Sequence, residues 1–170
     1  MIGCDFSGVF EKYKDVVYRF AWRMTNSHDL AEDITQDVFL SLLRQPAKFD
    51  ATRGQMRSYL LGIARNLALK AFRQGKNRWG ALDCEDFIAE PVDIVGRETA
   101  DIVGAAVQRL PPFQREVLIL SYYEGLSVAE IAQSVKAEVG TVKSRLHRAR
   151  ENLRRMLGPL KEGIRNGTTN

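Results

Sequence analysis

Residues 126–157, LSVAEIAQSVKAEVGTVKSRLHRARENLRRML, predict two helices joined by a tight turn. Ser127 and Glu130 fit an S-x-x-E capping box, in which the hydroxyl and the carboxylate satisfy backbone N–H groups at a helix start. We expect this short helix to end near Ser134, because residues 136–138 leave room only for a turn. The stretch therefore predicts a helix-turn-helix.

The second helix of this pair is predicted to be apolar on one side and polar on the other. Its apolar stripe has a 3-4-3-4-3 spacing and consists of Val139, Val142, Leu146, Ala149, Leu153 and Met156. The hydrogen-bond donors that face away from this stripe are Thr141, Lys143, Ser144, His147 and Arg148. A solvated basic surface and a membrane-surface helix are alternatives. The cap, the short turn and the polar residues near the helix start favour contact with the major groove of duplex DNA.

Length and composition limit the class of protein. A chain of 170 residues has room for one medium domain or two small ones, and its 45% hydrophobic share suffices for packed cores. The apolar runs are shorter than the roughly 18 residues that a membrane-spanning helix needs. Because no signal-peptide pattern is present, we expect a cytoplasmic protein. Cys4 and Cys84 are isolated, which predicts neither a metal site nor a disulfide and leaves a redox role open.

Charges are segregated along the chain, although the net charge is only +4. Residues 51–82 contain seven basic residues and no acid, whereas residues 83–101 contain seven acids and only Arg97 as a base. The helix-turn-helix is basic again. This order predicts two cationic surfaces joined by an acidic linker.

The first half of the chain predicts three helices. The first, near residues 6–24, and the second, at about 28–43, each carry apolar residues at helical spacing. The second helix has more apolar residues than one stripe requires, namely Phe39, Leu40 and Leu43, which could cover a neighbouring helix. Beside them lies an acidic patch that consists of Glu32, Asp33, Gln36 and Asp37. This patch is either a solubilising surface or a protein-docking site.

The third helix is expected at residues 56–73, after a polar loop at 48–55. Its core stripe is predicted to contain Met56, Leu60, Ile63, Ala64, Leu67 and Ala71. A second stripe, rotated away from the first, consists of Tyr59, Gly62, Asn66, Lys70 and Arg73. On such a face an aromatic ring can stack on a base, an amide can hydrogen-bond to a base edge, and cations can neutralise phosphate. A partly buried tyrosine on an ordinary polar face is the alternative.

We therefore predict an all-α chain of two small helical domains. Domain one is expected at residues 1–78, a flexible acidic linker at 79–99, domain two at 100–160 and a flexible tail at 161–170. Domain two would contain a helix up to Leu110, which Pro111-Pro112 ends, a helix at 113–124 and the helix-turn-helix. We expect these four helices to form one compact unit.

Four stretches in this order resemble the bacterial RNA polymerase sigma factors, specifically the small extracytoplasmic-function (ECF) group. They are DLAEDITQDVFLSLLR (29–44), FDATRGQMRSYLLGIARNLALKAFRQGKNR (49–78), LPPFQREVLILSYYEGLSVAEIAQSV (110–135) and VGTVKSRLHRAR (139–150). The resemblance implies a sigma region 2-like bundle that binds core polymerase and opens the minus-ten promoter element. It also implies a sigma region 4-like domain that contacts the minus-thirty-five element as duplex.

The resemblance also implies a role for individual residues. Asp33, Gln36 and Asp37 correspond to the family's docking motif for a coiled coil of the largest polymerase subunits. The loop 49–55 corresponds to the family's pocket for a flipped-out base, and Asn66 to a contact with the unpaired strand. The expected minus-ten residues are Phe49, Arg53, Tyr59, Asn66, Lys70 and Arg73. The expected minus-thirty-five residues are Thr141, Lys143, Ser144, His147 and Arg148.

Two positions depart from the family pattern, and the variable loop 49–55 cannot be matched residue by residue. Lys70 lies where an acid or amide is common, and Glu138 replaces a proline before V-G-T-V. The expected partners are core RNA polymerase, promoter DNA as duplex and as melted strand, and an anti-sigma factor. No catalytic residue, metal or cofactor is expected. The alternative functions are a stand-alone helix-turn-helix regulator and a sigma-mimicking decoy for an anti-sigma factor.

Overall fold

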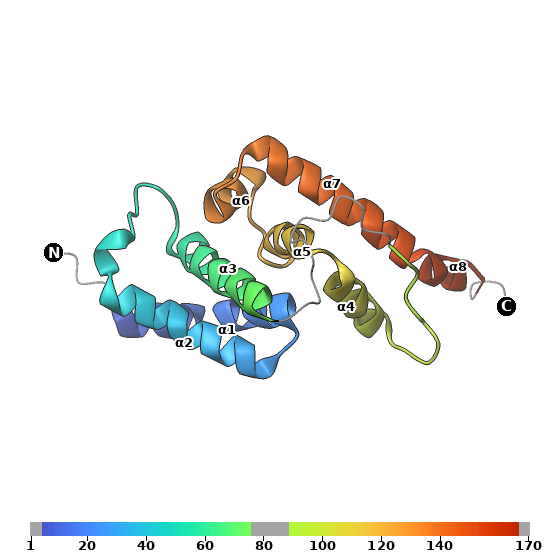
Figure 1. The fold of residues 1–170 in the computed structure, drawn as a ribbon, viewed down its shortest axis with the longest axis horizontal. Coiled ribbons are helices and arrows are strands. Elements are labelled where there is room, and N and C mark those ends of the chain that lie inside the picture. The colour runs from blue at the N-terminus through green and yellow to red at the C-terminus, as the bar shows by residue number, and fades with distance from the viewer. Residues whose placement is uncertain (1–4, 76–88, 167–170) are drawn as a thin grey trace.

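The structure is a computed structural model that describes residues 5–75 and 89–166. Within these ranges all regular structure is helical and no strand occurs. Helices α1 to α3 form one group, and helices α4 to α8 form a second group (Figure 1). The sequence-based prediction of an all-α chain with two helical units is confirmed. None of the described helices is long and apolar enough to cross a membrane.

The first group contains the three helices that the sequence predicts and one additional short turn. Its elements are α1 (Phe6–Thr25), α2 (His28–Arg44), the 3-10 turn η1 (Pro46–Lys48) and α3 (Met56–Gln74). Asn26 ends α1 in the left-handed conformation, with φ of 53°. Ser27 caps α2, since its side chain accepts a hydrogen bond from the N–H of Leu30 at 3.3 Å. These two residues form the tight turn between α1 and α2.

The core of the first group is made by residues of all three helices. Phe39 is buried against the rings of Phe6 and Phe10, with centroids 6.3 and 4.9 Å away, so it covers the neighbouring helix α1, as the sequence allowed. Leu40 and Leu43 stay 41% and 51% exposed. The fully buried residues of α3 are Leu60, Leu61, Ala64, Ala68 and Leu69. Of the predicted core stripe only Leu60 and Ala64 are among them, whereas Met56, Ile63, Leu67 and Ala71 are half-buried.

The second group contains α4 (Thr99–Arg109), α5 (Pro112–Leu118), the π-helical turn η2 (Ile119–Tyr123), α6 (Val128–Val135), α7 (Val139–Met156) and α8 (Gly158–Asn166). The expected single helix at 113–124 is divided by η2 into an α-helical and a π-helical part. Residues 158–166 form α8, where the sequence suggested only a frayed tail. The side chain of Leu160 packs against the core, which gives this segment an apolar anchor.

The described end of the acidic linker lies against the second group. The N–H of Val92 donates to the carbonyl of Met156 at 3.0 Å, and the Val92 side chain is buried. Arg109 donates to the carbonyl of Pro91 at 3.4 Å. Pro91 and Val92 are therefore held against α4 and α7. Cys4, Lys76, Arg78 and Cys84 lie outside the described residues.

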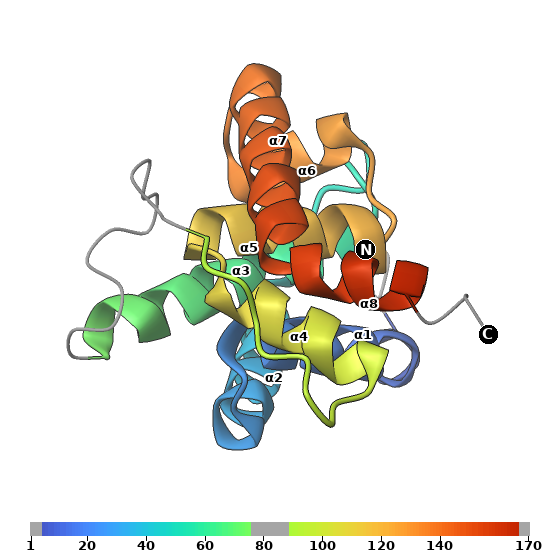
Figure 2. The same cartoon turned by 90° about the vertical axis from the view of Figure 1, so that its right-hand side faces the viewer.

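The two groups pack against each other, with α5 between α7 on one side and α1 and α3 on the other (Figures 1 and 2). Arg115 of α5 is buried at this contact and donates hydrogen bonds to the carbonyls of Met24, Gln108 and Leu110. Burial lowers the pKa of Arg115 to about 10, so its guanidinium remains charged at neutral pH. Gln108 likewise donates to the carbonyl of Arg23. The last turn of α1 is thus capped by side chains of the second group.

Candidate nucleic-acid interface

The helix-turn-helix has the geometry that its sequence predicts. Ser127 Oγ accepts from the N–H of Glu130 at 3.2 Å, and Glu130 Oε2 accepts from the N–H of Ser127 at 2.8 Å. These hydrogen bonds hold the pKa of Glu130 below its usual value. Lys136 ends α6 in the left-handed conformation, with φ of 51°. The capping box and the short turn are confirmed.

The surface of α7 presents most of the residues expected at the minus-thirty-five element. Lys143, Ser144 and His147 are exposed, and Thr141 and Arg148 are half-buried. Arg148 Nη2 donates to Ser144 Oγ at 3.1 Å, which orients its guanidinium along the helix. Glu138 is the N-cap residue of α7 and makes no side-chain capping hydrogen bond. The arrangement leaves a polar helix face of the kind that enters a major groove.

The acidic patch on α2 is fully accessible to a partner. Asp33, Gln36 and Asp37 are exposed on α2, and Glu32 is exposed beside them. Leu40 and Leu43, one to two turns further along the same helix, are the exposed apolar residues mentioned above. The structure thus places carboxylates, an amide and two leucines on the outer surface of one helix.

The loop before α3 forms one wall of a pocket of about 490 Å³. The loop is fixed by Asp50, whose Oδ1 accepts from the N–H of Thr52 at 2.9 Å and from its hydroxyl at 2.6 Å. These two hydrogen bonds lower the pKa of the Asp50 carboxyl, and the bond from the Thr52 hydroxyl has the larger effect. Phe49 packs on Tyr59 with ring centroids 5.4 Å apart, and burial raises the pKa of the Tyr59 phenol. Phe49, Arg53 and Tyr59 line the pocket together.

The other three expected minus-ten residues lie away from this pocket. Asn66, Lys70 and Arg73 are exposed along α3. With a helical rise of about 1.5 Å per residue, Arg73 is roughly 21 Å from Tyr59 along the axis. Three of the six expected residues therefore line the pocket, and the other three form a polar track along α3. Within this track Asn66 Oδ1 accepts a hydrogen bond from Arg65 Nη1 at 3.1 Å. Such a track suits a strand that continues beyond a captured base.

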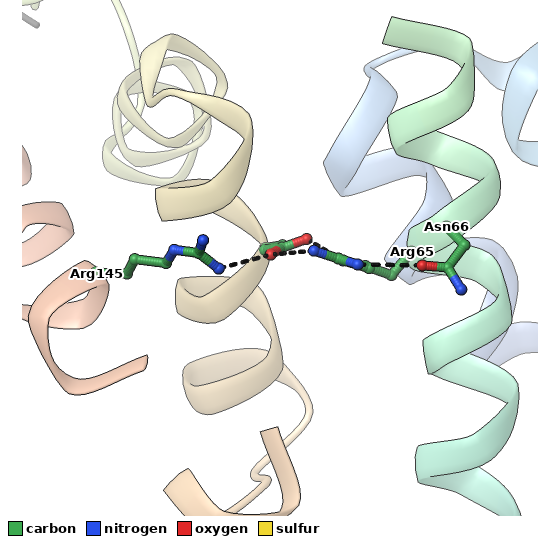
Figure 3. A network of polar contacts seen from close by, with 4 residues as sticks. Arg65, Asn66 and Arg145 are labelled. Carbon is green, nitrogen blue, oxygen red and sulfur yellow. Dashed lines mark hydrogen bonds and ion pairs between the residues drawn. The ribbon is translucent and has the colours of Figure 1, made fainter. Parts of the chain in front are cut away.

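An ionic network that the sequence analysis missed joins the two groups of helices (Figure 3). Arg65 donates from Nε to Glu116 Oε2 at 2.6 Å and from Nη2 to Glu116 Oε1 at 3.0 Å. Arg145 of α7 lies 3.7 Å from the same carboxylate. Arg65 and Arg145 also lie over the ring of Phe113, at 5.6 and 4.3 Å from its centroid. Glu116 thus pairs with one arginine from each group.

A second buried carboxylate repeats this arrangement nearby. Glu124 Oε2 accepts from Arg57 Nη2 at 2.7 Å, and Glu124 Oε1 lies 3.8 Å from Arg23. The pocket wall opposite the loop is also supplied by the second group, through Gln133, Ser134 and Lys136. The sequence signal for this network was the presence of Glu116 directly before the apolar run 117–120 and of Glu124 shortly after it, because buried carboxylates require a cationic partner. The sequence alone does not indicate which arginines those partners are.

Both groups match known families. Residues 9–78 match the model for Sigma-70 region 2, and residues 100–153 match that for Sigma-70, region 4. Because both regions match, the alternative of a regulator that uses only a helix-turn-helix is not favoured.

Similar proteins agree with these matches. The ECF RNA polymerase sigma factor SigW of Bacillus subtilis (strain 168) is 32% identical over an alignment of 170 positions, gaps included, which covers 91% of this chain and 90% of SigW. The sigma factor RpoE from Bartonella quintana, solved in complex with the anti-sigma factor NepR, superposes with a TM-score of 0.70 at 26% identity. The match covers 91% of this chain and 97% of RpoE. CnrH, solved with the cytosolic domain of CnrY, has the same fold, with a TM-score of 0.63, 22% identity, and coverage of 87% and 84%. The chain therefore belongs to the ECF RNA polymerase sigma factors.

Proposed function

We propose that the protein directs core RNA polymerase to a promoter with two surfaces, one on each group of helices. The observation that carries this proposal is the presence, on one chain, of an exposed acidic patch on α2, an aromatic-lined pocket before α3 and a polar face on α7. Polymerase supplies the nucleotide chemistry, so the chain itself needs to bind and not to catalyse. We expect it to act in the cytoplasm, where polymerase acts on DNA.

Each surface has a distinct task in this proposal. Asp33, Gln36 and Asp37 bind the polymerase. The face of α7 contacts the bases of the minus-thirty-five duplex, where a good bidentate contact discriminates by about 1–3 kcal/mol. The pocket at Phe49 and Tyr59 holds a base that has left the stack. Extrusion costs a few kcal/mol, which stacking on an aromatic ring and a fitted pocket offset.

Two DNA-binding groups on one chain bind jointly when both promoter elements lie within reach. Binding of the first element raises the effective concentration of the second group at its own element. Specificity then depends on the two sequences and on the spacing between them.

We further propose that an anti-sigma factor binds the protein, as NepR binds the similar RpoE. Leu40 and Leu43 are exposed next to the acidic patch, so a partner that covers them would also block the polymerase-docking residues. Failure of the chain to initiate at any promoter, combined with tight anti-sigma binding, would instead indicate a decoy.

The proposal is tested by polymerase binding. Replacing Asp33, Gln36 and Asp37 together with Ala should weaken the affinity of the full-length chain for core polymerase at least tenfold, measured by fluorescence anisotropy. Glu11 is an exposed acid on α1 and provides the matched control as Glu11→Ala. Unchanged affinity of the triple variant would refute the docking assignment.

A further inference from the structure

We propose that the pocket between the loop 49–55 and α6 binds a free mononucleotide, a molecule that joins an aromatic base to a chain of phosphates. This ligand goes beyond the proposed function, because it binds the free protein without polymerase or promoter DNA. The pocket has a volume of about 490 Å³, within the range of about 300–1,000 Å³ that is typical of small-molecule sites. Its walls come from both groups of helices, so it combines side chains that neither group supplies by itself.

The wall on the side of α3 offers an aromatic surface for the base. The rings of Phe49 and Tyr59 both line the pocket, with centroids 5.4 Å apart and planes inclined at 56°. Because these rings contact each other, the base stacks on the outer face of one ring and is not held between them. Both side chains are only half-buried, which leaves such a face accessible. Stacking on an aromatic ring is open to every base, so the rings place the base without selecting one.

The charges around the pocket favour an anion. Among the described residues that line it, Lys48, Arg53 and Lys136 are cations and Asp50 is the only acid. The Asp50 carboxylate already accepts two hydrogen bonds from Thr52 and lies 3.4 Å from the Arg53 guanidinium. Lys48 and Lys136 are exposed and form no ion pair within the described part of the chain. Their ammonium groups are therefore available to phosphate oxygens.

A hydroxyl without a partner lies where the two walls meet. Ser134 Oγ of α6 donates to the carbonyl of Ser58 at 3.3 Å, and both residues line the pocket. The hydroxyl of Ser58 itself is buried and has no hydrogen-bond partner among the residues that the structure describes. A buried unsatisfied hydroxyl destabilises a protein, so a hydrogen bond to a ligand is favourable at this point. A ribose hydroxyl can serve, since it both donates and accepts.

The wall from α6 distinguishes two sources of the same chemistry. A single strand of promoter DNA also brings a base and phosphates, and the proposed function places one of its bases at Phe49 and Tyr59. Its other phosphates continue along α3. A free mononucleotide keeps base and phosphates within one pocket, where Lys136 faces the loop wall that carries Lys48. The mononucleotide therefore requires both lysines, whereas the strand does not require Lys136.

Isothermal titration calorimetry of the full-length protein with ATP and with GTP tests the site. Adenosine and guanosine present the base alone, and inorganic triphosphate presents the anion alone. We expect each nucleotide to bind at one site per chain and at least tenfold more tightly than its nucleoside or inorganic triphosphate, because only the nucleotide engages the rings and the lysines together. No binding of either nucleotide, or equally tight binding of inorganic triphosphate, would overturn the inference.

Two substitutions assign the binding to this pocket. Lys136→Asn removes the ammonium group from α6 and introduces a residue that tolerates the left-handed conformation of this position, with φ of 51°. Lys48→Gln removes the ammonium group from the loop wall. Each should weaken nucleotide binding at least fivefold, with an unchanged circular dichroism spectrum. Lys161→Gln is the matched control, since Lys161 is exposed on α8 and does not line the pocket. Losses no greater than that of the control would overturn the inference.

Failure of this site is distinguishable from failure of the proposed function. We would titrate the same protein with a single-stranded oligonucleotide of mixed sequence, whose affinity Lys136→Asn should leave unchanged. If the oligonucleotide binds and neither nucleotide does, the pocket serves promoter DNA alone and the inference is wrong, while the proposed function stands. If a nucleotide binds at both lysines and the chain directs no initiation with core polymerase, the proposed function fails and the nucleotide site stands.

Discussion

Arg65 of α3 and Glu116 of α5 form a bidentate ion pair between the two groups of helices, with N–O distances of 2.6 and 3.0 Å (Figure 3). Glu116 is 0% exposed and the Arg65 side chain 13% exposed. Charge-assisted bidentate pairs of this kind are short and directional. A single carboxylate therefore connects the helix expected at the minus-ten element with Arg145, on the helix expected at the minus-thirty-five element.

Removing this carboxylate should destabilise the protein. Glu116→Ala leaves two arginines without their shared partner in a buried position, and breaking a buried pair costs about 3–5 kcal/mol. We expect a loss of this order in the free energy of unfolding, measured by urea denaturation with circular dichroism. Glu151→Ala removes an exposed pair with Arg154 within one turn of α7 and should cost less than about 1 kcal/mol. Equal effects of the two substitutions would contradict the assigned role of Glu116.

The capping box of α6 should make the helix-turn-helix sensitive to acid. Ser127→Ala removes the cap and should cost about 1 kcal/mol. The lowered pKa of Glu130 means that its ionised form stabilises the folded state fully above the ordinary value of 4.5, and that this contribution is lost as the pH falls through the lowered pKa. Glu130→Gln should therefore reduce the pH dependence of thermal unfolding below 4.5. An unaltered pH profile would contradict the box as a stabilising element.

The polar face of α7 should determine affinity for the minus-thirty-five duplex. Arg148→Ala should weaken binding of the cognate duplex by about 1–3 kcal/mol, and should weaken binding of a scrambled duplex much less. Arg154→Ala is the control, because Arg154 lies exposed on the same helix, about two turns beyond the proposed contact. Electrophoretic mobility shifts of the holoenzyme at two salt concentrations would show the difference. Equal losses for both variants would indicate a non-specific charge effect.

The aromatic wall of the pocket should be needed for promoter opening and not for duplex binding. Tyr59→Ala removes one of the two rings that line the pocket, and stacking of a base on an aromatic side chain contributes about 1–3 kcal/mol. We expect weaker permanganate reactivity of unpaired thymines at the minus-ten element, with Tyr59→Phe close to the unsubstituted protein. Normal opening by Tyr59→Ala would show that the base is held elsewhere.

The sequence predicted those features that depend on local periodicity and on caps. The Ser127–Glu130 box, the turn at residues 136–138 and the outward face of α7 follow from spacing alone, and the structure has them. Asp33, Gln36 and Asp37 were correctly expected on an outer face of α2. Their role as a docking site stays a prediction, as do the DNA contacts.

Features that depend on packing between distant segments could not be predicted. The pairing of Arg65 with Glu116 joins residues 51 positions apart, and no local pattern specifies which arginine meets a buried carboxylate. The full burial of Leu61, Ala68 and Leu69 on α3 was missed for the same reason, because it depends on contacts with other helices. The sequence allowed that Phe39 covers a neighbouring helix but did not indicate its partners, Phe6 and Phe10 of α1.

Run-off transcription with purified core polymerase and a library of genomic fragments tests the central claim most directly. With the full-length chain added, we predict transcripts from a limited set of start sites that share two sequence elements at a fixed spacing. Core polymerase alone should yield none of these transcripts, and the combined substitution Asn66→Ala and Arg148→Ala should alter or abolish the choice of start sites. Transcripts that do not depend on the chain, or a start-site choice that ignores both substitutions, would contradict the account.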